Sequence, residues 1–373
     1  MRTLTWAEAR SRRLRRSHLV TPAPRSKAVE VVRDVCGLQA QLLSAAELAL
    51  SARVRGVTRE WVHEMLWTKR ELVRAWTVRG TIHVIPADDL PLWVAALGTR
   101  RYWESTEWLE RHELTVKDAT AIFDAVADSL SERPATRAQI ADAVVQRLGP
   151  RFRPKIASMW GEMLGPVTYM GKLCFGPSVG TNVTFVRADR WIRTWPRVDP
   201  DEAWRELIRR FLRAYGPTPL EGVTRWFGIE PATALGILRS LGDEAISLRI
   251  EGRGAWMLAD DAGGTRPVSG VRLLAQYDSY VIGSHPRDTV IDPAARAQIR
   301  AYKRGKFEGA VGVPVLVIDG VVSGVWERVE RGGKVQITVR PAVALRADRR
   351  RAIAAEADRI GVVLGRAASL SVA

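Results

Sequence analysis

The chain has 373 residues, 46% of them hydrophobic and 26% charged, which is typical of a folded protein with two to four domains. Its 57 Lys and Arg against 41 Asp and Glu give a net charge of +16, which favours nucleic acid as a partner over an anionic membrane surface. Two cysteines and five scattered histidines exclude a disulfide framework and a four-ligand zinc site, so we expect neither a metal nor another cofactor.

The positive charge is carried mainly by arginine, since only 8 of the 57 basic residues are Lys. A GC-rich genome would favour Arg over Lys, but it does not account for the excess over acidic residues. No apolar run reaches the ~20 residues needed to span a bilayer, and no apolar stretch of signal-peptide length follows the N-terminus. We therefore expect a cytoplasmic protein with no membrane association.

Residues 6–19 have the apolar spacing of a helix and carry five arginines: Arg10, Arg12, Arg13, Arg15 and Arg16. Either these side chains form a solvated helix face, or they contact phosphate groups. The sequence leaves both interpretations open. Residues 21–24, with two prolines, end the helical pattern, and a second helix is predicted over residues 27–35. Cys36 follows in an apolar run, which predicts a buried and unreactive thiol.

Two amides, Gln39 and Gln41, interrupt the otherwise apolar stretch that begins at Gly37. Residues two apart on an α-helix point roughly 200° away from each other. The two amides can therefore serve one site only if the segment is extended or bent, which Gly37 permits. The alternative is a helix in which each amide bonds neighbouring backbone groups. Glu47 either holds a water or, as we expect, is an exposed carboxylate.

Residues 60–69 read as a helix and residues 72–85 as strands, the order of a winged helix. On a strand, Arg79, Thr81 and His83 would share one face and form a polar row. His83 is either a satisfied side chain of a wing strand or a residue that contacts nucleic acid or supports such a contact. Arg74 and Arg79 are candidate phosphate contacts. Three tryptophans of the next helical stretch are predicted core residues: Trp93, Trp103 and Trp108.

The same order of elements repeats along the chain. A helix capped by Thr136 extends to residue 148 and is followed by a strand-rich segment, 167–186. A second copy begins at residue 216, with a helix over 231–241 and strands over 245–250 and 255–258. Counting the N-terminal region, the pattern predicts three winged-helix units.

Beyond residue 270 the pattern changes to strands over 313–318, 321–327 and 335–339, followed by a helix over 348–364. Asp319-Gly320 and Gly332-Gly333 are typical hairpin turns. Two basic stretches, 304–306 and 328–334, are either DNA contacts or solvated turns. We predict an α+β fold with winged-helix units at 1–115, 116–198 and 199–265, and a β-barrel-like domain at 266–373.

Four longer stretches carry a resemblance to a known family: VVRDVCGLQAQLLSAAELALSARVRGVT, LVRAWTVRGTIHVIPADDL, YGPTPLEGVTRWFGI and VRLLAQYDSYVIG. In this order, together with WAEAR near the start, they resemble the AlkZ-like DNA glycosylases over essentially the whole chain. The combination of Gln-x-Gln with Arg-Gly-Thr-Ile-His some forty residues later is the specific part of the match.

The resemblance implies three winged-helix units and a C-terminal β-barrel arranged around a DNA channel. It also implies excision of alkylated nucleobases, including bulky N7-guanine adducts and interstrand crosslinks formed by natural-product genotoxins. Gln39 and Gln41 match the catalytic Gln-x-Gln of the branch linked to toxin self-resistance. AQYD departs from the commoner Pro-x-Phe-Asp, so Tyr277 and Asp278 stand only as candidates for DNA contact or for support of the catalytic pair.

The sequence therefore predicts a monomeric, monofunctional DNA glycosylase that acts on double-stranded DNA carrying alkylated purines. The absence of a lysine in an apolar pocket pattern argues against a covalent lyase step. Two other classes stay open. One is a non-catalytic winged-helix DNA-binding regulator, which would usually have one such unit and a dimerisation or ligand domain. The other is a toxin-sequestering protein, which would need a deep aromatic pocket.

Overall fold

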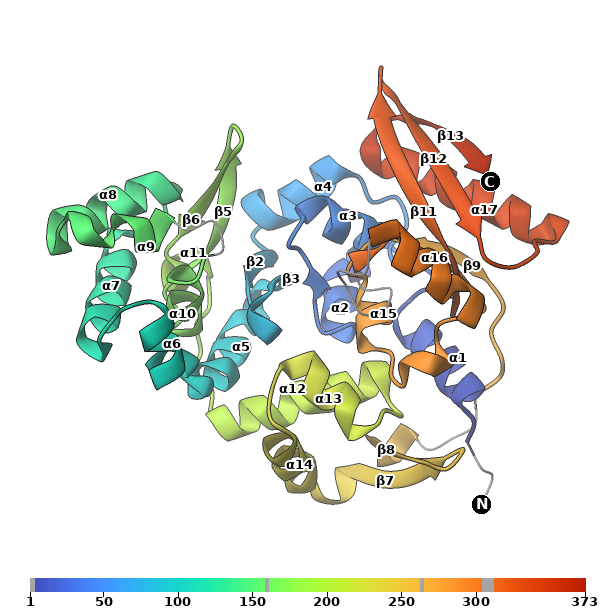
Figure 1. The fold of residues 1–373 in the computed structure, drawn as a ribbon, viewed down its shortest axis with the longest axis horizontal. Helices are drawn as coiled ribbons and strands as arrows, with labels where there is room; N and C mark the ends of the chain where they lie inside the picture. The colour runs from blue at the N-terminus through green and yellow to red at the C-terminus, as the bar shows by residue number, and fades with distance from the viewer. Residues whose placement is uncertain (1–3, 158–160, 262–264, 304–311) are drawn as a thin grey trace. The chain divides into compact units, whose positions relative to one another are not determined.

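The computed structural model describes residues 4–157, 161–261, 265–303 and 312–373, and it divides into two compact units (Figure 1). Unit 1 joins residues 1–62 to residues 205–373, and unit 2 is residues 63–204. The basic stretch 304–306 lies outside the described residues. In the part of the chain that the structure describes, no helix is long and apolar enough to cross a membrane.

Unit 1 begins with helices and one short strand. Thr5 and Glu8 form a capping box at the start of the first helix, where each side chain bonds the other residue's backbone N–H. The elements of this region are α1 (Trp6–Arg16), α2 (Ala28–Asp34), β1 (Leu38–Gln39), α3 (Leu43–Ser51) and α4 (Arg59–His63).

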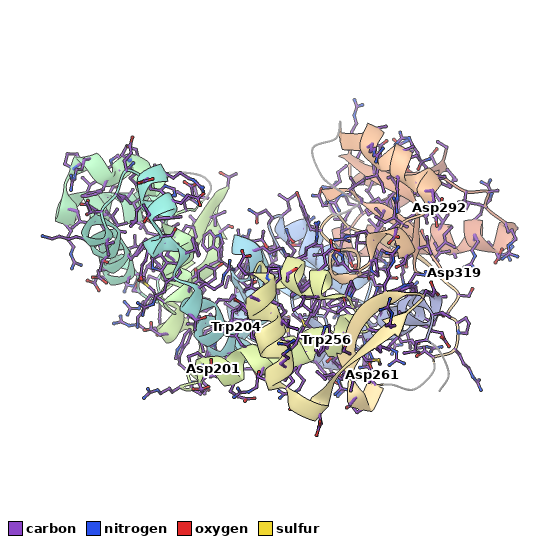
Figure 2. All side chains as sticks on the ribbon, turned by 60° about the horizontal axis from the view of Figure 1, so that its bottom comes forward. Asp201, Trp204, Trp256, Asp261, Asp292 and Asp319 are labelled. Carbon is purple, nitrogen blue, oxygen red and sulfur yellow. The ribbon has the colours of Figure 1, made fainter. Side chains whose placement is uncertain are left out.

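The second part of unit 1 has the predicted order of helices and hairpin. It comprises the C-terminal part of α12 (Pro200–Tyr215), then α13 (Leu220–Phe227), α14 (Pro231–Ser240), β7 (Ala245–Ile250) and β8 (Arg253–Leu258). β7 and β8 pair antiparallel in unbroken register from Ala245 with Leu258 to Ile250 with Arg253. Thr218 bridges to Trp256, labelled in Figure 2, and so ties the start of this segment to its hairpin.

The C-terminal part of unit 1 is a five-stranded sheet in the order β13-β12-β11-β10-β9. Its strands are β9 (Val271–Leu274), β10 (Val315–Ile318), β11 (Val321–Arg331), β12 (Lys334–Pro341) and β13 (Ala367–Val372), and its helices are α15 (Ser279–Gly283), α16 (Pro293–Lys303) and α17 (Ala347–Leu364). The sheet curls, but no pairing joins its edge strands in the described residues, so it forms a half-barrel (Figure 1). The edge strands β9 and β13 are elements that sequence reasoning missed.

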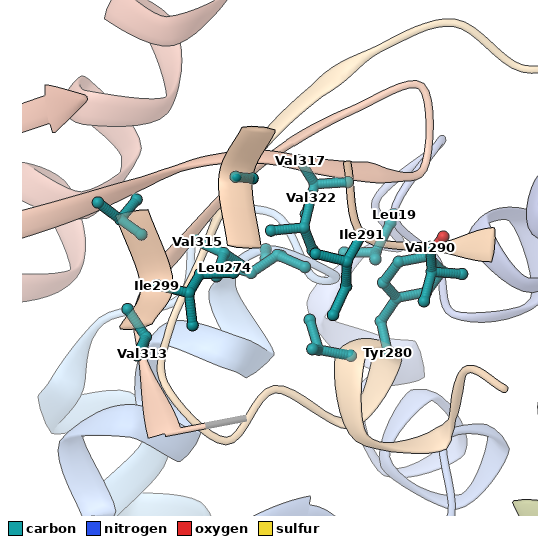
Figure 3. Close-up of a cluster of buried hydrophobic side chains, with 14 of the residues drawn as sticks. Leu19, Leu274, Tyr280, Val290, Ile291, Ile299, Val313, Val315, Val317 and Val322 are labelled. Atoms are coloured by element: carbon teal, nitrogen blue, oxygen red, sulfur yellow. The ribbon is translucent and has the colours of Figure 1, made fainter. Parts of the chain in front are cut away.

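Both faces of this sheet are buried at β9, β10 and the first part of β11, because alternate residues there belong to different apolar clusters, whereas β12 and β13 have one exposed face. One cluster joins Val315 and Val317 to Leu14 and Leu19 of the N-terminal segment (Figure 3). The other contains Leu316, α17 side chains, and Ala45 and Leu48 of α3. The helix that directly follows Gln41 is therefore fixed on the sheet of the C-terminal part.

Unit 2 is mainly helical and contains two small groups of strands. The strands are β2 (Leu72–Trp76), β3 (Ile82–Pro86), β4 (Ala135–Thr136), β5 (Cys174–Val179) and β6 (Asn182–Val186). The helices are α5 (Leu90–Leu97), α6 (Thr106–Arg111), α7 (Val116–Ser129), α8 (Arg137–Leu148), α9 (Arg153–Ala157), α10 (Leu164–Tyr169) and α11 (Ala188–Trp191). β4, β6 and β5 form one sheet in that order.

Several expectations for unit 2 are confirmed, and one boundary is wrong. Thr136 caps α8 as predicted, and Trp93, Trp103 and Trp108 are buried. The segment predicted as strands from residue 167 begins instead as the end of α10, because Gly171 ends that helix with φ 73° before the chain enters β5. Both cysteines are buried, and burial raises the pKa of Cys174.

Candidate active site

The Gln-Ala-Gln segment is not helical. Helix α2 ends at Asp34, and the chain then passes through Cys36 and Gly37, whose φ angles of 56° and 90° lie in the left-handed region. β1 covers Leu38 and Gln39, and no helix begins before Leu43. The geometric condition for two amides to serve one site is met, because the backbone between the two helices is extended or bent.

The burial pattern of this segment distinguishes the two amides. Leu38, Gln39 and Ala40 are all buried, with 8% exposure at Gln39, whereas Gln41 is exposed. Side chains two apart on extended backbone project to the same side. The segment therefore holds a buried amide at Gln39 and, two residues later where the chain bends, an exposed one at Gln41. Two amide dipoles this close in sequence are candidates to act on one small group.

Behind this segment, α3 is fixed by charged side chains. Glu47 is 2% exposed and pairs with Arg59, with 3.0 Å between Oε2 and Nε. The expectation of an exposed carboxylate at Glu47 was wrong, because α3 turns that face toward α4 and the C-terminal sheet. Arg359 of α17 donates to the Leu48 carbonyl at 3.5 Å and to Ser51 Oγ at 2.6 Å. The C-terminal half of α3 is held at several points.

Arg328 of β11 lies within electrostatic reach of the Glu47–Arg59 pair. Burial lowers its pKa, and the charges of Arg59 and Glu47 act on it in opposite directions. Its Nη1 atom is buried and has no hydrogen-bond partner among the described residues. Arg328 is thus partly inside the protein, whereas the hairpin tip at Val329–Lys334 is exposed.

The arginines of α1 are largely internal. Arg13 has 0% exposure, and it donates to the carbonyls of Tyr215 at 2.8 Å and His285 at 2.6 Å, and to that of Pro217. Arg12 pairs with Asp261 at 2.8 Å, and the half-buried Arg16 also pairs with Asp261 (Figure 2). The phosphate-contact interpretation fails for Arg13, because its guanidinium cannot reach solvent from this position.

Asp278 and Tyr277 lie at a sharp turn before α15. Tyr277 is half-buried with φ 63°, and Asp278 caps α15 by accepting from the Tyr280 backbone N–H at 2.9 Å. Asp278 also forms a bidentate ion pair with Arg53, at 2.7 and 2.8 Å, in which both side chains have 0% exposure. Asp278 is therefore internal and does not meet DNA directly.

The polar row predicted for unit 2 does not form. β2 and β3 pair from Leu72 with Pro86 to Trp76 with Ile82, so residues 77–81 are the turn between them. Arg79 sits in that turn with φ 58°, and Thr81 precedes the first strand residue. Of the three side chains, His83 alone belongs to a strand, and Arg79 and Thr81 are half-buried at the turn.

His83 and Arg74 are both buried within unit 2. His83 is 1% exposed, its Nδ1 lies 2.7 Å from Thr77 Oγ1, and its Nε2 has no partner among the described residues. Burial and the charge of Arg79 lower the pKa of His83 to about 3. Its imidazole is therefore neutral at physiological pH and cannot act as a general acid there. Burial lowers the pKa of Arg74 to about 10, and its guanidinium lies 4.4 Å from the Phe175 ring centroid.

Unit 2 also contains a cavity of about 430 Å³ whose lining includes Trp103, Phe123 and Tyr169. Val116 and Met170, which also line it, are exposed apolar side chains. No group of three or more His, Cys, Asp or Glu side chains is placed to hold a metal ion anywhere in the described ranges.

Some of these residues were missed by sequence reasoning. Arg53 and Arg59 drew no attention, although an arginine inside the apolar run LALSARV, as Arg53 is, is a signal for a buried ion pair. Tyr215 was quoted only as part of a motif. Its hydroxyl donates to the Val35 carbonyl at 2.9 Å, directly before the turn that leads to Gln39.

Taken together, a charge of +16, repeated helix–hairpin segments and two amides on an extended segment define a nucleic-acid-directed protein with a candidate amide-based site. A family model described as DNA glycosylase AlkZ-like matches residues 32–362. The chain therefore belongs to the AlkZ-like DNA glycosylase family.

Two comparisons with individual proteins agree with this membership. An interstrand DNA cross-link repair glycosylase from Streptomyces sahachiroi is 31% identical over 343 residues, covering 88% of this chain and 89% of that protein. The solved structure of Streptomyces sahachiroi DNA glycosylase AlkZ superimposes with a TM-score of 0.86 at 27% identity, over 100% of both chains.

Proposed function

We propose that this protein is a monofunctional DNA glycosylase that hydrolyses the N-glycosidic bond of cationic N7-alkylguanine or N3-alkyladenine lesions. Bulky natural-product adducts and interstrand crosslinks are its substrates, in DNA repair or toxin self-resistance in the cytoplasm. The observation that carries the proposal is the non-helical Gln39-Ala40-Gln41 segment, with Gln39 buried and Gln41 exposed, in a member of the AlkZ-like family. The related Streptomyces sahachiroi protein is named for cross-link repair.

The chemistry of a side-chain amide fits a lesion that is already charged. Excision of a neutral base needs a positioned acid to activate the leaving group. An N7-alkylated purine carries a positive charge, so its glycosidic bond is weakened and the base leaves neutral. The site then has to stabilise an oxocarbenium-like sugar and orient a water. A Gln carbonyl does both as an oriented dipole, although an amide is too weak a base to remove a proton outright.

The proposed architecture is three winged-helix units, at residues 1–115, 116–198 and 199–265, followed by a barrel-like domain at 266–373. Two features support it. In unit 1, α13 and α14 precede the β7–β8 hairpin, and Thr218 bridges to that hairpin. In unit 2, α7 and α8 flank β4, which pairs with β6 of the β5–β6 hairpin. Both place helices before an antiparallel hairpin and pair a preceding residue or strand with that hairpin, as a winged helix does.

DNA contact through the tip of the β11–β12 hairpin would explain its exposed cations, Arg331 and Lys334. Replacing both by Ala should weaken DNA binding at low salt and reduce the slope of log K against log salt by about 2, because each lost phosphate contact removes roughly 0.9. Fluorescence anisotropy with a labelled duplex measures both. Arg350→Ala with Arg351→Ala, two exposed arginines of α17, is the matched control. Equal slopes for all three proteins would contradict a hairpin contact.

Substrate selectivity tests the proposed reaction itself. We expect the protein to release N7-methylguanine from duplex DNA, leaving abasic sites, and to release hypoxanthine at least about 100-fold more slowly, because hypoxanthine leaves as an anion unless an acid protonates it. Incubation under single-turnover conditions followed by alkaline cleavage of abasic sites gives both rates. Equal rates would contradict the amide mechanism, since they would require an acid that the site does not supply.

Base release and toxin binding distinguish the glycosylase from the other two classes of protein. A DNA-binding regulator would bind the duplex and release no base from any lesion. A toxin-sequestering protein would bind the genotoxin without DNA, and the cavity lined by Trp103, Phe123 and Tyr169 is the place in unit 2 where such binding would quench tryptophan fluorescence.

A further inference from the structure

The turn that leads into the Gln-Ala-Gln segment is stabilised from behind by a side chain distant in sequence. Helix α2 ends at Asp34, so the carbonyl of Val35 lies at a helix terminus, where backbone carbonyls lack partners within the helix. The hydroxyl of Tyr215 donates to this carbonyl at 2.9 Å. The next two residues, Cys36 and Gly37, have positive φ and redirect the chain into β1. Tyr215 therefore bonds the backbone carbonyl at which α2 ends and the turn toward Gln39 begins.

The ring of Tyr215 has little freedom to move. Phe211 and Trp226 lie 5.2 and 5.0 Å from it between ring centroids. A Cβ atom at Gly283 of α15 would lie 2.5 Å from the ring carbons, so only glycine allows this approach. Arg13 donates to the backbone carbonyl of Tyr215 at 2.8 Å. Backbone and ring are both restrained, which fixes the direction of the hydroxyl.

The hydroxyl of Tyr215 lies within electrostatic reach of a buried polar network, because Ser279, Arg53 and Asp278 all act on its pKa. Within that network Arg53 lies 3.4 Å from Ser279 Oγ. Arg53 in turn pairs with Asp278 and donates to the Ala49 carbonyl at 2.8 Å in α3. Neighbouring buried polar groups therefore bond the chain on both sides of the two glutamines, Tyr215 at Val35 before them and Arg53 at Ala49 after them.

We propose that Tyr215 is a positioning residue for Gln39 and Gln41, acting by holding the Val35 carbonyl and so the direction in which the extended segment leaves α2. The inference rests on the proposed function of the two glutamines. Two backbone bonds of the helix end close the turn itself, from the Cys36 N–H to the Arg33 carbonyl at 3.0 Å and from the Gly37 N–H to the Val32 carbonyl at 2.9 Å, and neither uses the Val35 carbonyl. The Tyr215 hydroxyl adds the bond that ties this turn to a distant part of unit 1, and so fixes its direction relative to that part. Tyr215 itself touches no substrate.

Tyr215→Phe tests the proposal, because it removes the hydroxyl and leaves the ring packing intact. Misplacement of reacting groups by a fraction of an ångström to 1 Å lowers rates by up to about 100-fold, so we expect a single-turnover excision rate about 10- to 100-fold below that of the unaltered protein at saturating enzyme. The dissociation constant for the same N7-methylguanine duplex should stay within about 2-fold, since no DNA contact is removed.

Tyr280→Phe is the matched control. Tyr280 is also buried, and its hydroxyl donates to a backbone carbonyl, that of Gly320, at 2.7 Å. Both variants lose one buried hydroxyl and should lose similar stability, but only Tyr215→Phe should slow excision. Equal losses of rate in the two variants, or an unaltered rate in Tyr215→Phe, would overturn the positioning role. An inactive unaltered protein would instead overturn the proposed function.

A second measurement tests the positioning role without any activity. Hydrogen–deuterium exchange of peptides that cover residues 36–42 should be faster in Tyr215→Phe than in the unaltered protein and in Tyr280→Phe. Unchanged exchange in these peptides would show that the hydroxyl does not restrain the segment, and the inference would fail whatever the excision rates.

Discussion

Gln39→Ala and Gln41→Ala are each expected to reduce the single-turnover excision of N7-methylguanine by about 100- to 1,000-fold. This is the usual loss when one preorganised dipole is removed from a developing charge. The two amides act on one sugar and one water, so the double variant should lose less than the product of the two single losses. Abasic-site formation in a labelled duplex measures all three rates.

DNA binding should be nearly unaffected in these variants, because neither amide supplies phosphate neutralisation. Gln146→Ala, an exposed glutamine of α8, is the control for a Gln to Ala change as such. Retained excision in both single variants would refute a catalytic role for the pair and favour the reading of the protein as a DNA-binding regulator.

The geometric condition for the glutamine pair could be stated from the sequence, because it depends on local rules, although a helix was the alternative until the structure placed β1 there. A period of 3.6 residues cannot place residues 39 and 41 on one side of a helix, and Gly37 adjacent to them indicates a turn. The hairpins at Asp319-Gly320 and at Gly332-Gly333 were predicted for the same reason, since their turn residues determine the local backbone.

The environment of the pair could not be predicted, because it depends on residues more than 150 positions away. Arg13 reads as one of five basic residues on a helix face, yet its acceptors are carbonyls of residues 215, 217 and 285. The hydroxyl that bonds Val35 comes from residue 215. Local patterns predict which face of a helix is polar, but not whether a distant polar group meets that face.

The row of Arg79, Thr81 and His83 shows a different limit. An alternating pattern predicts a strand, but a hairpin needs its turn somewhere within the run. Here the turn falls at residues 77–81 and removes two of the three residues from the strand. To predict where a β-strand ends, one must therefore know its register with the partner strand, and the sequence of one strand does not contain that information.

Asp278→Asn should destabilise unit 1 by about 3–5 kcal/mol, the usual cost of removing one partner of a fully buried ion pair. Asn keeps the volume and the ability to cap α15, so the change isolates the loss of charge opposite Arg53, whose side chain has 0% exposure. The pKa of Arg53 is raised, since Asp278's charge and hydrogen bonds outweigh the burial that opposes its protonation. Urea unfolding measures the free energy.

Two further variants make this result decisive. Glu221→Gln breaks the pair with Arg225, in which both side chains are 57% exposed, and should cost less than about 1 kcal/mol. Arg53→Met combined with Asp278→Asn should cost less than Asp278→Asn alone, because no unpaired charge then stays buried. A loss below 1 kcal/mol for Asp278→Asn would contradict the buried pair.

The temperature dependence of the excision rate distinguishes a loss of stability from a loss of positioning. Asp278→Asn should lose excision steeply only where unit 1 begins to unfold, since its main effect is on the folded fraction. Tyr215→Phe should be slow at every temperature at which the protein is fully folded, because its hydroxyl acts on the geometry of the folded state. If the two variants instead lost activity in parallel with their unfolding curves, the Arg53–Asp278 pair and the Tyr215 hydroxyl would serve stability alone.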